Sequence, residues 1–223
     1  WLKVAKFFDL PARPVMKMVC GRTPAPLAAF QKKWGWEEAV TNWRSVVESD
    51  EIDLVDICTP NDSHSRIAIA AAKAGKHIAC EKPLGMNTAD ARKMLSAAEK
   101  ARVRHMVWFN YRRTQALSLA KRIVDEGRLG EIYHVRAAYL QDWIMDPKFP
   151  LVWRLKKAIA GSGAHGDLNA HIIDVALFLV GKIESVTGMT KTFITERPIA
   201  AGSRKKGKVT VDDAALFLAK FEN

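Results

Sequence analysis

The sequence predicts an α/β protein with a doubly wound parallel sheet in its first half, followed by an α+β domain with a mostly antiparallel open sheet. Short apolar runs in the first half alternate with helix-like segments of about 10–15 residues, the pattern of consecutive βαβ units. The second half has longer alternating segments, which are typical of half-exposed antiparallel strands. We place the boundary near Asn110, which gives domains at 1–110 and 111–223.

Four apolar runs in the first half are expected strands, because each stops at a glycine, a proline or a polar residue. They cover 15–20, 52–58, 77–80 and 104–110. The expected helices between them are rich in alanine or end at a glycine, and they cover 25–34, 65–74 and 88–101. Thr88 is the expected N-cap of the last helix.

The second half contains helix-like segments at 117–126, 153–159 and 166–180, and strand-like segments at 132–140, 185–196 and 209–221. A basic cluster, Arg204 to Lys208, is flanked by glycine and serine, and we interpret it as a solvated loop. Residues 1–8 resemble the end of an earlier helix with no glycine-rich turn before it, and the chain stops directly after an apolar strand. We therefore expect a chain that is incomplete at both ends.

Composition narrows the class of protein. The net charge of +11 raises nucleic acid as a partner, but the cations are dispersed and lack an interleaved aromatic pattern, so we expect no nucleic-acid partner. No apolar run reaches the roughly 18–20 residues that a membrane span needs, so we expect no membrane partner. Cys20, Cys58 and Cys80 each lie in an apolar run, which predicts reduced, buried thiols in a cytoplasmic protein and no metal site.

Two separated groups of polar residues stand out against apolar surroundings. Lys82 follows the expected strand 77–80, at the carboxyl end where doubly wound sheets bind their ligands. Asp167 and His171 are four residues apart on an otherwise apolar helix, so they share a face. A lysine can stabilise a developing alkoxide, and a histidine can accept a hydroxyl proton. The alternatives are a surface lysine before a turn, and an Asp–His pair that only stabilises its helix.

Several segments together resemble the glucose–fructose oxidoreductase / inositol dehydrogenase (Gfo/Idh/MocA) family. They are Asp56-Ile57-Cys58-Thr59-Pro60-Asn61, Glu81-Lys82-Pro83, Asn110-Tyr111-Arg112, the run 127–132 and the run Gly163 to His171. The resemblance covers essentially the whole chain in the family's order. It implies an N-terminal Rossmann domain, lacking here its first strand and Gly-rich loop, and an incomplete C-terminal α/β domain for substrate binding and oligomerisation. It also implies an NAD- or NADP-dependent oxidoreductase.

The resemblance implies roles for individual residues. Lys82, Asp167 and His171 are the expected catalytic residues, with His171 as the base and Asp167 orienting its ring or binding a neighbouring hydroxyl. The expected cofactor contacts are Arg22, Thr59, Pro60, Asn61, His64, Glu81 and Lys82. The expected substrate contacts are Trp153, Arg154, Asp142 and His165, with Trp143 a weaker candidate. The structural alternatives are a helix-start His64, a strand-end salt bridge at Glu81, and a packed Trp153 beside a solvated Arg154.

Arg22 follows the expected strand 15–20, where an NAD-specific site would have an acidic residue and an arginine accommodates the 2′-phosphate of NADP. The sequence thus leans slightly toward NADP, unless Arg22 is a solvated loop residue. We also predict a cis Lys82–Pro83 peptide bond, because a tight turn after a buried strand would aim Lys82 into the crevice.

These observations predict hydride transfer between nicotinamide and a secondary hydroxyl or ketone of a sugar or cyclitol. A non-catalytic regulator that senses the dinucleotide is the alternative, and the presence of both Lys82 and His171 argues against it. We expect a homo-oligomer formed through the C-terminal sheet.

Overall fold

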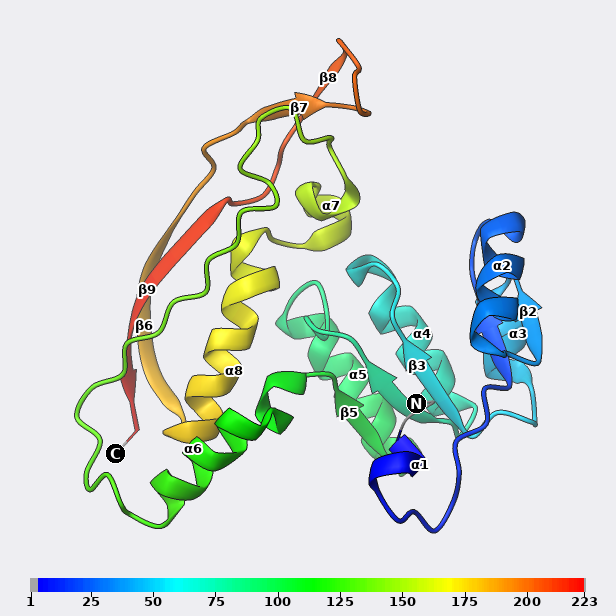
Figure 1. Cartoon of the computed structure of the whole chain (residues 1–223), viewed down its shortest axis with the longest axis horizontal. Helices are drawn as coiled ribbons and strands as arrows, with labels where there is room; N and C mark the ends of the chain where they lie inside the picture. Colours follow the sequence, from blue (N-terminus) through cyan, green and yellow to red (C-terminus); the bar gives the residue numbers. More distant parts are fainter. Residues whose placement is uncertain (1–3, 223) are drawn as a thin grey trace.

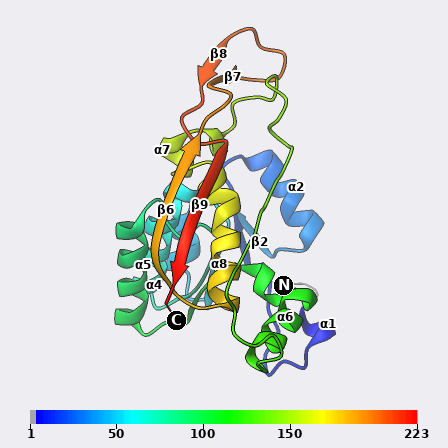
Figure 2. The ribbon, with the colours of Figure 1, turned by 90° about the vertical axis from the view of Figure 1, so that its left-hand side faces the viewer.

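The computed structural model describes residues 4–222 of the chain. Two halves enclose an open angle in Figure 1, and we call residues 4–109 the N-terminal half and residues 110–222 the C-terminal half. Helix α8 lies between the N-terminal half and the long strands β6 and β9 (Figure 1), and Figure 2 shows these strands lying in front of it. No helix in the described residues is long and apolar enough to cross a membrane.

The N-terminal half is built from parallel strands, as predicted. Strands β3 (Leu54–Ile57), β4 (His77–Cys80) and β5 (His105–Val107) form one sheet, and β1 (Met18–Cys20) pairs with β2 (Glu38–Val40). We expected one continuous sheet, but no ladder joins these two sheets in the described residues. Strand β2 and helix α3 (Trp43–Glu48) were not expected, because both are too short to show a clear period.

Four further helices complete this half. They are α1 (Val4–Phe7), α2 (Pro24–Trp34), α4 (His64–Lys73) and α5 (Thr88–Ala101). Helix α1 occupies part of the segment interpreted as the end of an earlier helix, and residues 1–3 and 223 lie outside the described residues. Asn87 caps α5 by accepting a hydrogen bond from the Asp90 N–H at 2.9 Å. The predicted cap Thr88 is therefore wrong by one position, since Asn87 is the residue with extended backbone geometry.

A single hydrophobic core holds the N-terminal half together. Its members are Val47, Ile52, Val55, Ile57, Ile67, Ala68, Ala71, Ala72, Ile78, Cys80, Met94, Ala98 and Val103. The alanines of α4 allow this helix to pack closely on the strands and on α5. The carboxyl ends of β3 and β4 are consequently fixed, and the residues that follow them start from rigid positions.

The C-terminal half has shorter and more numerous elements than predicted. Its helical segments are η2 (Asn110–Arg113), α6 (Gln115–Asp125), η3 (Trp153–Leu155), α7 (Lys157–Ala160), the π-helical turn η4 (His165–Asn169) and α8 (Ala170–Leu179). The predicted helix 153–159 is thus divided in two, because Lys156 has extended backbone angles.

Antiparallel pairs form the rest of this half. Strand β6 (Ile183–Lys191) pairs with β9 (Ala214–Phe221), and β7 (Glu196–Pro198) pairs with β8 (Lys206–Lys208). The predicted strand 132–140 is wrong: the segment alternates in sequence, but it has no ladder partner among the described residues. The basic cluster is also not entirely a loop, since Lys206–Lys208 forms β8.

Candidate active site

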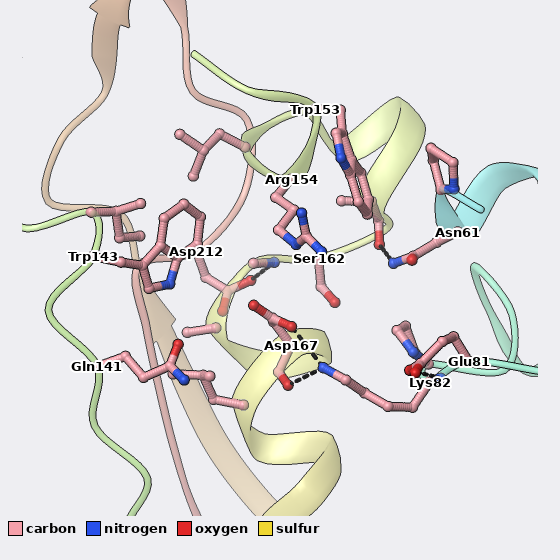
Figure 3. A pocket seen from close by; sticks show the side chains of 18 of the residues that line it. Asn61, Glu81, Lys82, Gln141, Trp143, Trp153, Arg154, Ser162, Asp167 and Asp212 are labelled. Atoms are coloured by element: carbon pink, nitrogen blue, oxygen red, sulfur yellow. Dashed lines mark hydrogen bonds and ion pairs between the residues drawn. The ribbon is translucent and has the colours of Figure 1, made fainter. Parts of the chain in front are cut away.

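A cavity of about 590 Å³ opens at the carboxyl ends of β1, β3 and β4 and is closed by the C-terminal half (Figure 3). Most of the predicted site residues line it: Arg22, Thr59, Pro60, Asn61, Glu81, Lys82, Trp153, Arg154 and Asp167, together with the weaker candidate Trp143. His64, Asp142, His165 and His171 are not part of this lining. The volume falls within the roughly 300–1,000 Å³ typical of small-molecule sites.

Lys82 projects from the end of β4 into the C-terminal half. The preceding Cys80 is fully buried, and the Lys82–Pro83 peptide bond is cis, as predicted. The Lys82 ammonium donates to the Asp167 carboxylate Oδ1 and to the Asp167 carbonyl, both at 2.7 Å. The lysine side chain is only 14% exposed. Lys82 is therefore paired with a charged partner, and the alternative interpretation of a free surface lysine is wrong.

The turn that carries Asp167 is held by Asp212, a residue that the sequence analysis missed. The Asp212 carboxylate accepts hydrogen bonds from the Gly163 N–H at 2.8 Å and from the His165 N–H at 2.7 Å. Its carbonyl accepts from the Ala164 N–H at 3.0 Å. A Cβ at position 163 would lie 1.8 Å from the Asp212 carbonyl oxygen, so only glycine permits this approach.

His171 lies on α8 and is 8% exposed. Its ring stacks on the Tyr111 ring, with centroids 4.3 Å apart and planes at 21°. Its Nδ1 is buried and has no hydrogen-bond partner within the described part of the chain. Burial, and then the positive charge of Lys82, lower the pKa of His171 below its ordinary value. Asp167 bonds to Lys82 instead of to His171, so the expected orienting Asp–His hydrogen bond is not formed here.

His64 is fully buried and does not face the cavity. Its Nδ1 lies 3.1 Å from the Pro83 carbonyl and its Nε2 lies 2.8 Å from the Thr59 carbonyl. The ring therefore braces the turns that follow β3 and β4 against each other. His64 thus lies outside the cavity lining, and its expected cofactor contact stays a prediction.

Asn61 and Glu81 both form hydrogen bonds near the carboxyl ends of β3 and β4. Asn61 donates from its amide to the Ala160 carbonyl at 2.8 Å, which joins the end of β3 to the C-terminal half. Glu81 accepts from the Lys82 backbone N–H at 3.1 Å, so it is not engaged in a strand-end salt bridge with a lysine or arginine among the described residues. Both line the cavity on the side formed by the N-terminal half.

The C-terminal wall of the cavity is aromatic and basic. The Arg154 guanidinium lies over the Trp153 ring, 4.4 Å from its centroid, and Trp143 packs edge-on against Phe149. Asp142 and His165 are exposed and lie outside the lining, and their expected substrate contacts stay predictions. The backbone N–H of His165 donates to Asp212. Asp142 directly precedes Trp143, which lines the cavity.

The lining also includes residues that sequence reasoning missed: Cys58, Gln141, Ser162, Asp212 and Asp213. Cys20 and Cys58 are exposed, not buried as predicted, because each lies where a strand ends; Cys80 is buried. All three are free cysteines. Although Cys58 is exposed as a residue, partial desolvation of its thiol in the cavity wall and the nearby Asp56 and Glu81 raise its pKa to about 12, so the thiol stays protonated. In the described residues no group of three or more His, Cys, Asp or Glu is arranged to hold a metal ion.

Comparison with known proteins identifies this arrangement. Residues 5–109 match the model described as an oxidoreductase family with an NAD-binding Rossmann fold, and residues 117–223 match the GFO/IDH/MocA C-terminal domain. The chain belongs to the Gfo/Idh/MocA family. The Rossmann-type N-terminal domain and the C-terminal domain with antiparallel strands are those expected from the sequence.

Similar Gfo/Idh/MocA proteins are named as sugar and cyclitol dehydrogenases. The chain is 43% identical to levoglucosan dehydrogenase of Pseudarthrobacter phenanthrenivorans, over 97% of this chain and 58% of that protein. It is 29% identical to myo-inositol 2-dehydrogenase of Thermotoga maritima, over 88% of this chain and 54% of that protein. The structure of levoglucosan dehydrogenase in complex with NADH and levoglucosan matches with a TM-score of 0.94 and 44% identity, over 99% of this chain and 58% of that one. The chain therefore spans little more than half the length of these relatives.

The cavity fits a nicotinamide dinucleotide on its N-terminal side. Thr59, Pro60, Asn61 and Glu81 follow parallel strands whose carboxyl ends open into the cavity, the place where this architecture binds dinucleotides. The buried Nδ1 of His171 has no partner among the described residues and lies near the lysine charge, and such an orphaned polar atom suits a polar ligand.

Proposed function

We propose that the protein is an NAD(P)-dependent dehydrogenase acting on a secondary hydroxyl of a sugar or cyclitol. One observation carries this: Lys82, from the end of a Rossmann strand, is hydrogen-bonded to Asp167 in the cavity, and the charges of both residues act on the buried His171. An ammonium and a neutral imidazole from two halves of a molecule suit the removal of a hydroxyl proton.

The residues at the ends of β3 and β4 would hold a nicotinamide, which would supply the acceptor for the hydride of the alcohol carbon. The lowered pKa keeps His171 neutral at neutral pH, so its ring can take the hydroxyl proton. The Lys82 ammonium has three N–H donors, and Asp167 accepts from it through two atoms. The remaining donor can bind the substrate oxygen and stabilise its developing negative charge. Asp167 thus acts by holding Lys82.

Thr59, Pro60, Asn61 and Glu81 are the residues we propose to hold the nicotinamide and its ribose. Complexes of levoglucosan dehydrogenase contain NADH, which supports NAD(H) for this chain. Arg22 favours NADP, because it lines the cavity directly after β1 and can pair with a 2′-phosphate. Comparing the affinities of NAD and NADP for the protein and for Arg22→Asp separates the two: an NADP enzyme loses NADP affinity selectively in this variant.

The proposed substrate side is the aromatic and basic wall formed by Trp143, Trp153 and Arg154. Aromatic faces suit the C–H surfaces of sugars, and arginine binds hydroxyl groups well. The similarity to levoglucosan dehydrogenase makes levoglucosan the first substrate to test, followed by myo-inositol and common aldoses.

Reduction of NAD and NADP by this panel, followed at the nicotinamide absorbance, tests the proposal. Lys82→Met and His171→Gln should each lower kcat by about 10²–10⁴-fold, as expected for general acid–base groups. Lys73→Met and His134→Gln are matched controls at exposed positions and should leave kcat unchanged. Tight dinucleotide binding without turnover of any substrate would contradict the proposal and indicate the sensing regulator.

We also propose a homo-oligomer formed through the C-terminal sheet in the cytoplasm. On one face of the β6–β9 pair, Met189, Leu216 and Leu218 are exposed at 62–76%. A second copy covering these side chains would remove this apolar area from water. Three free cysteines suit a reducing compartment. Replacing Leu216 and Leu218 with serine should shift the mass measured by light scattering to that of a monomer; an unchanged mass would contradict this interface.

A further inference from the structure

Three aromatic rings surround the His171 imidazole. Tyr111 stacks on its face with centroids 4.3 Å apart, and Phe109 approaches edge-on at 6.3 Å and 85°. Tyr139 is tilted at 6.0 Å, and it comes from the extended segment that precedes the cavity wall. Side chains from two separate segments, 109–111 and the segment of Tyr139, thus pack around one ring.

The ring of Tyr111 is itself fixed by polar contacts. Its hydroxyl lies 2.7 Å from the Tyr139 hydroxyl, and Gln141 donates from its amide to the Tyr139 hydroxyl at 2.9 Å. The next residue in η2, Arg112, forms a two-pronged ion pair with Asp174, which is 6% exposed and lies one turn after His171 on α8. Turn η2 therefore contacts α8 at two positions one helical turn apart, through a ring stack on His171 and an ion pair with Asp174.

We infer that Tyr111 is a positioning residue that fixes the orientation of the His171 ring and keeps water away from it. This inference rests on the proposed role of His171 as the base. A buried imidazole with an unpartnered Nδ1 has no hydrogen bond to set its rotation, so packing must set it. Of the aromatic rings in the described residues that contact His171, the stacked Tyr111 ring has the shortest centroid distance.

The effect of Tyr111 on the pKa of His171 can be separated from the effects of the charged groups around the ring. Lys82 lowers the pKa of His171, whereas Asp167 and Asp174 raise it, and burial is the largest cause of the net decrease. Tyr111 and Tyr139 are the titratable groups on the two other segments that pack on the ring, and their shared hydrogen bond raises the pKa of Tyr111. Removing the Tyr111 ring admits water and leaves the charges in place. The pKa of His171 should therefore rise toward its ordinary value.

The test compares Tyr111→Phe, Tyr111→Leu and Tyr111→Ala with the unaltered protein. Phenylalanine keeps the stack and loses only the hydroxyl contact with Tyr139, whereas leucine fills the space without stacking and alanine opens it. The matched control is Tyr133→Ala, at a tyrosine that is 86% exposed. Circular dichroism verifies folding, and the leucine variant keeps the test valid if the alanine variant does not fold.

The first readout is the NMR titration of the His171 C2–H, assigned by its loss in His171→Gln. It needs no activity, so it tests the inference even if the protein turns over no sugar. The pKa of His171 should rise in Tyr111→Ala, and should stay unchanged in Tyr111→Phe and in Tyr133→Ala. An unchanged pKa in a folded Tyr111→Ala protein would overturn the inference.

The second readout is turnover with the substrate found in the panel. Tyr111→Leu should lower kcat by about tenfold with KM little changed, because misplacing a base affects the chemical step. In Tyr111→Ala the rising limb of kcat against pH should move to higher pH, since the neutral ring is the active form. Tyr111→Phe should restore both properties. Equal losses in the phenylalanine and leucine variants would overturn the inference, because ring stacking would then have no part in the effect.

Discussion

The two halves of the molecule position their site residues by different physical means. In the N-terminal half, Thr59 to Asn61 and Lys82 follow strands that end in Ile57 and Cys80, which are 2% and 0% exposed. In the C-terminal half, Asp167 and the cavity wall depend on polar anchors such as Asp212 and the fully buried Arg197. The apolar cluster there contains three buried residues, Leu155, Val209 and Val211.

This difference has a consequence for how each half responds to change. A hydrophobic core distributes its stabilisation over many contacts, so one lost side chain affects the whole half. A polar anchor acts on the one or two groups it bonds, so its loss is local and can leave the fold intact. The first half should therefore behave as a unit, and the second as a set of separately fixed loops.

The largest expected effect is on the core. Ile57→Ala should lower the free energy of unfolding by about 2–5 kcal/mol, the range for large-to-small changes at buried positions. Chemical denaturation followed by fluorescence measures it. Val186→Ala, at a residue 66% exposed, is the control and should change stability by less than about 0.5 kcal/mol. Equal changes in the free energy of unfolding for Ile57→Ala and Val186→Ala would contradict the comparison, because the stability of β3 would then not depend on its core.

The next effect concerns the buried arginine of the C-terminal half. Arg197 donates to the Ile144 carbonyl at 2.5 Å and to the Asp146 carbonyl at 2.8 Å, and so holds the segment next to Trp143. Arg197→Met should cost about 1–3 kcal/mol, because both carbonyls lose a charged donor. Hydrogen exchange should accelerate around residues 144–146 while β3 and β4 stay protected. Uniform acceleration would show that the two halves are not independent; Arg204→Met at an exposed position is the control.

A smaller effect is expected at Asp212. Asp212→Ala should cost about 0.5–2 kcal/mol, the range for the loss of a capping side chain. Asp212→Asn should be intermediate, since an amide oxygen replaces only one of the two carboxylate acceptors that bind Gly163 and His165. Thermal unfolding measures both, with Asp142→Ala, at an exposed residue outside the cavity, as the control. An asparagine variant as stable as the unaltered protein would mean that one acceptor suffices.

The smallest effect is a dependence of stability on pH. The folded protein lowers the pKa of His171 below its ordinary value, so the unfolded state binds more protons between the two values. Stability from this residue is therefore present above the ordinary pKa and is lost as pH falls through the folded value. His171→Gln should flatten the acid side of the stability curve relative to the exposed-site control His134→Gln. A His171→Gln variant with the same dependence of stability on pH as the unaltered protein would show that protonating the buried His171 ring does not destabilise the folded state.

The fold was predictable where local pattern and burial coincide. Strand β4 was placed at its observed bounds and helix α5 to within one residue at its start, because an apolar run of four residues and an alanine-rich period are strong local signals. Segment 132–140 alternates equally well but has no partner, and a strand is defined by its partner. Strand β9 begins at Ala214 instead of residue 209, because Val209 and Val211 serve the small cluster and Asp212 serves a turn.

The site was predictable where its residues follow strands or belong to compact motifs. Lys82, Asp167 and Asn61 were identified in this way, and the structure brings them to one cavity. Asp212 could not be found, since its partner Gly163 is 49 residues away and no local pattern records the contact. The contacts of His64 with the Thr59 and Pro83 carbonyls could not be predicted, because a histidine after a strand looks the same in sequence whether it faces a ligand or contacts two turns.

Two hydrogen-bonded contacts cross between the halves in the wall of the cavity: Asn61 with the Ala160 carbonyl, and Lys82 with Asp167 (Figure 3). Ligands that bind to opposite sides of this wall share these contacts, so their binding free energies are not independent. By thermodynamic necessity, the factor by which a dinucleotide changes the affinity for the sugar equals the factor by which the sugar changes the affinity for the dinucleotide. Asn61→Ala, which removes one crossing contact and leaves the other, should bring that common factor closer to one.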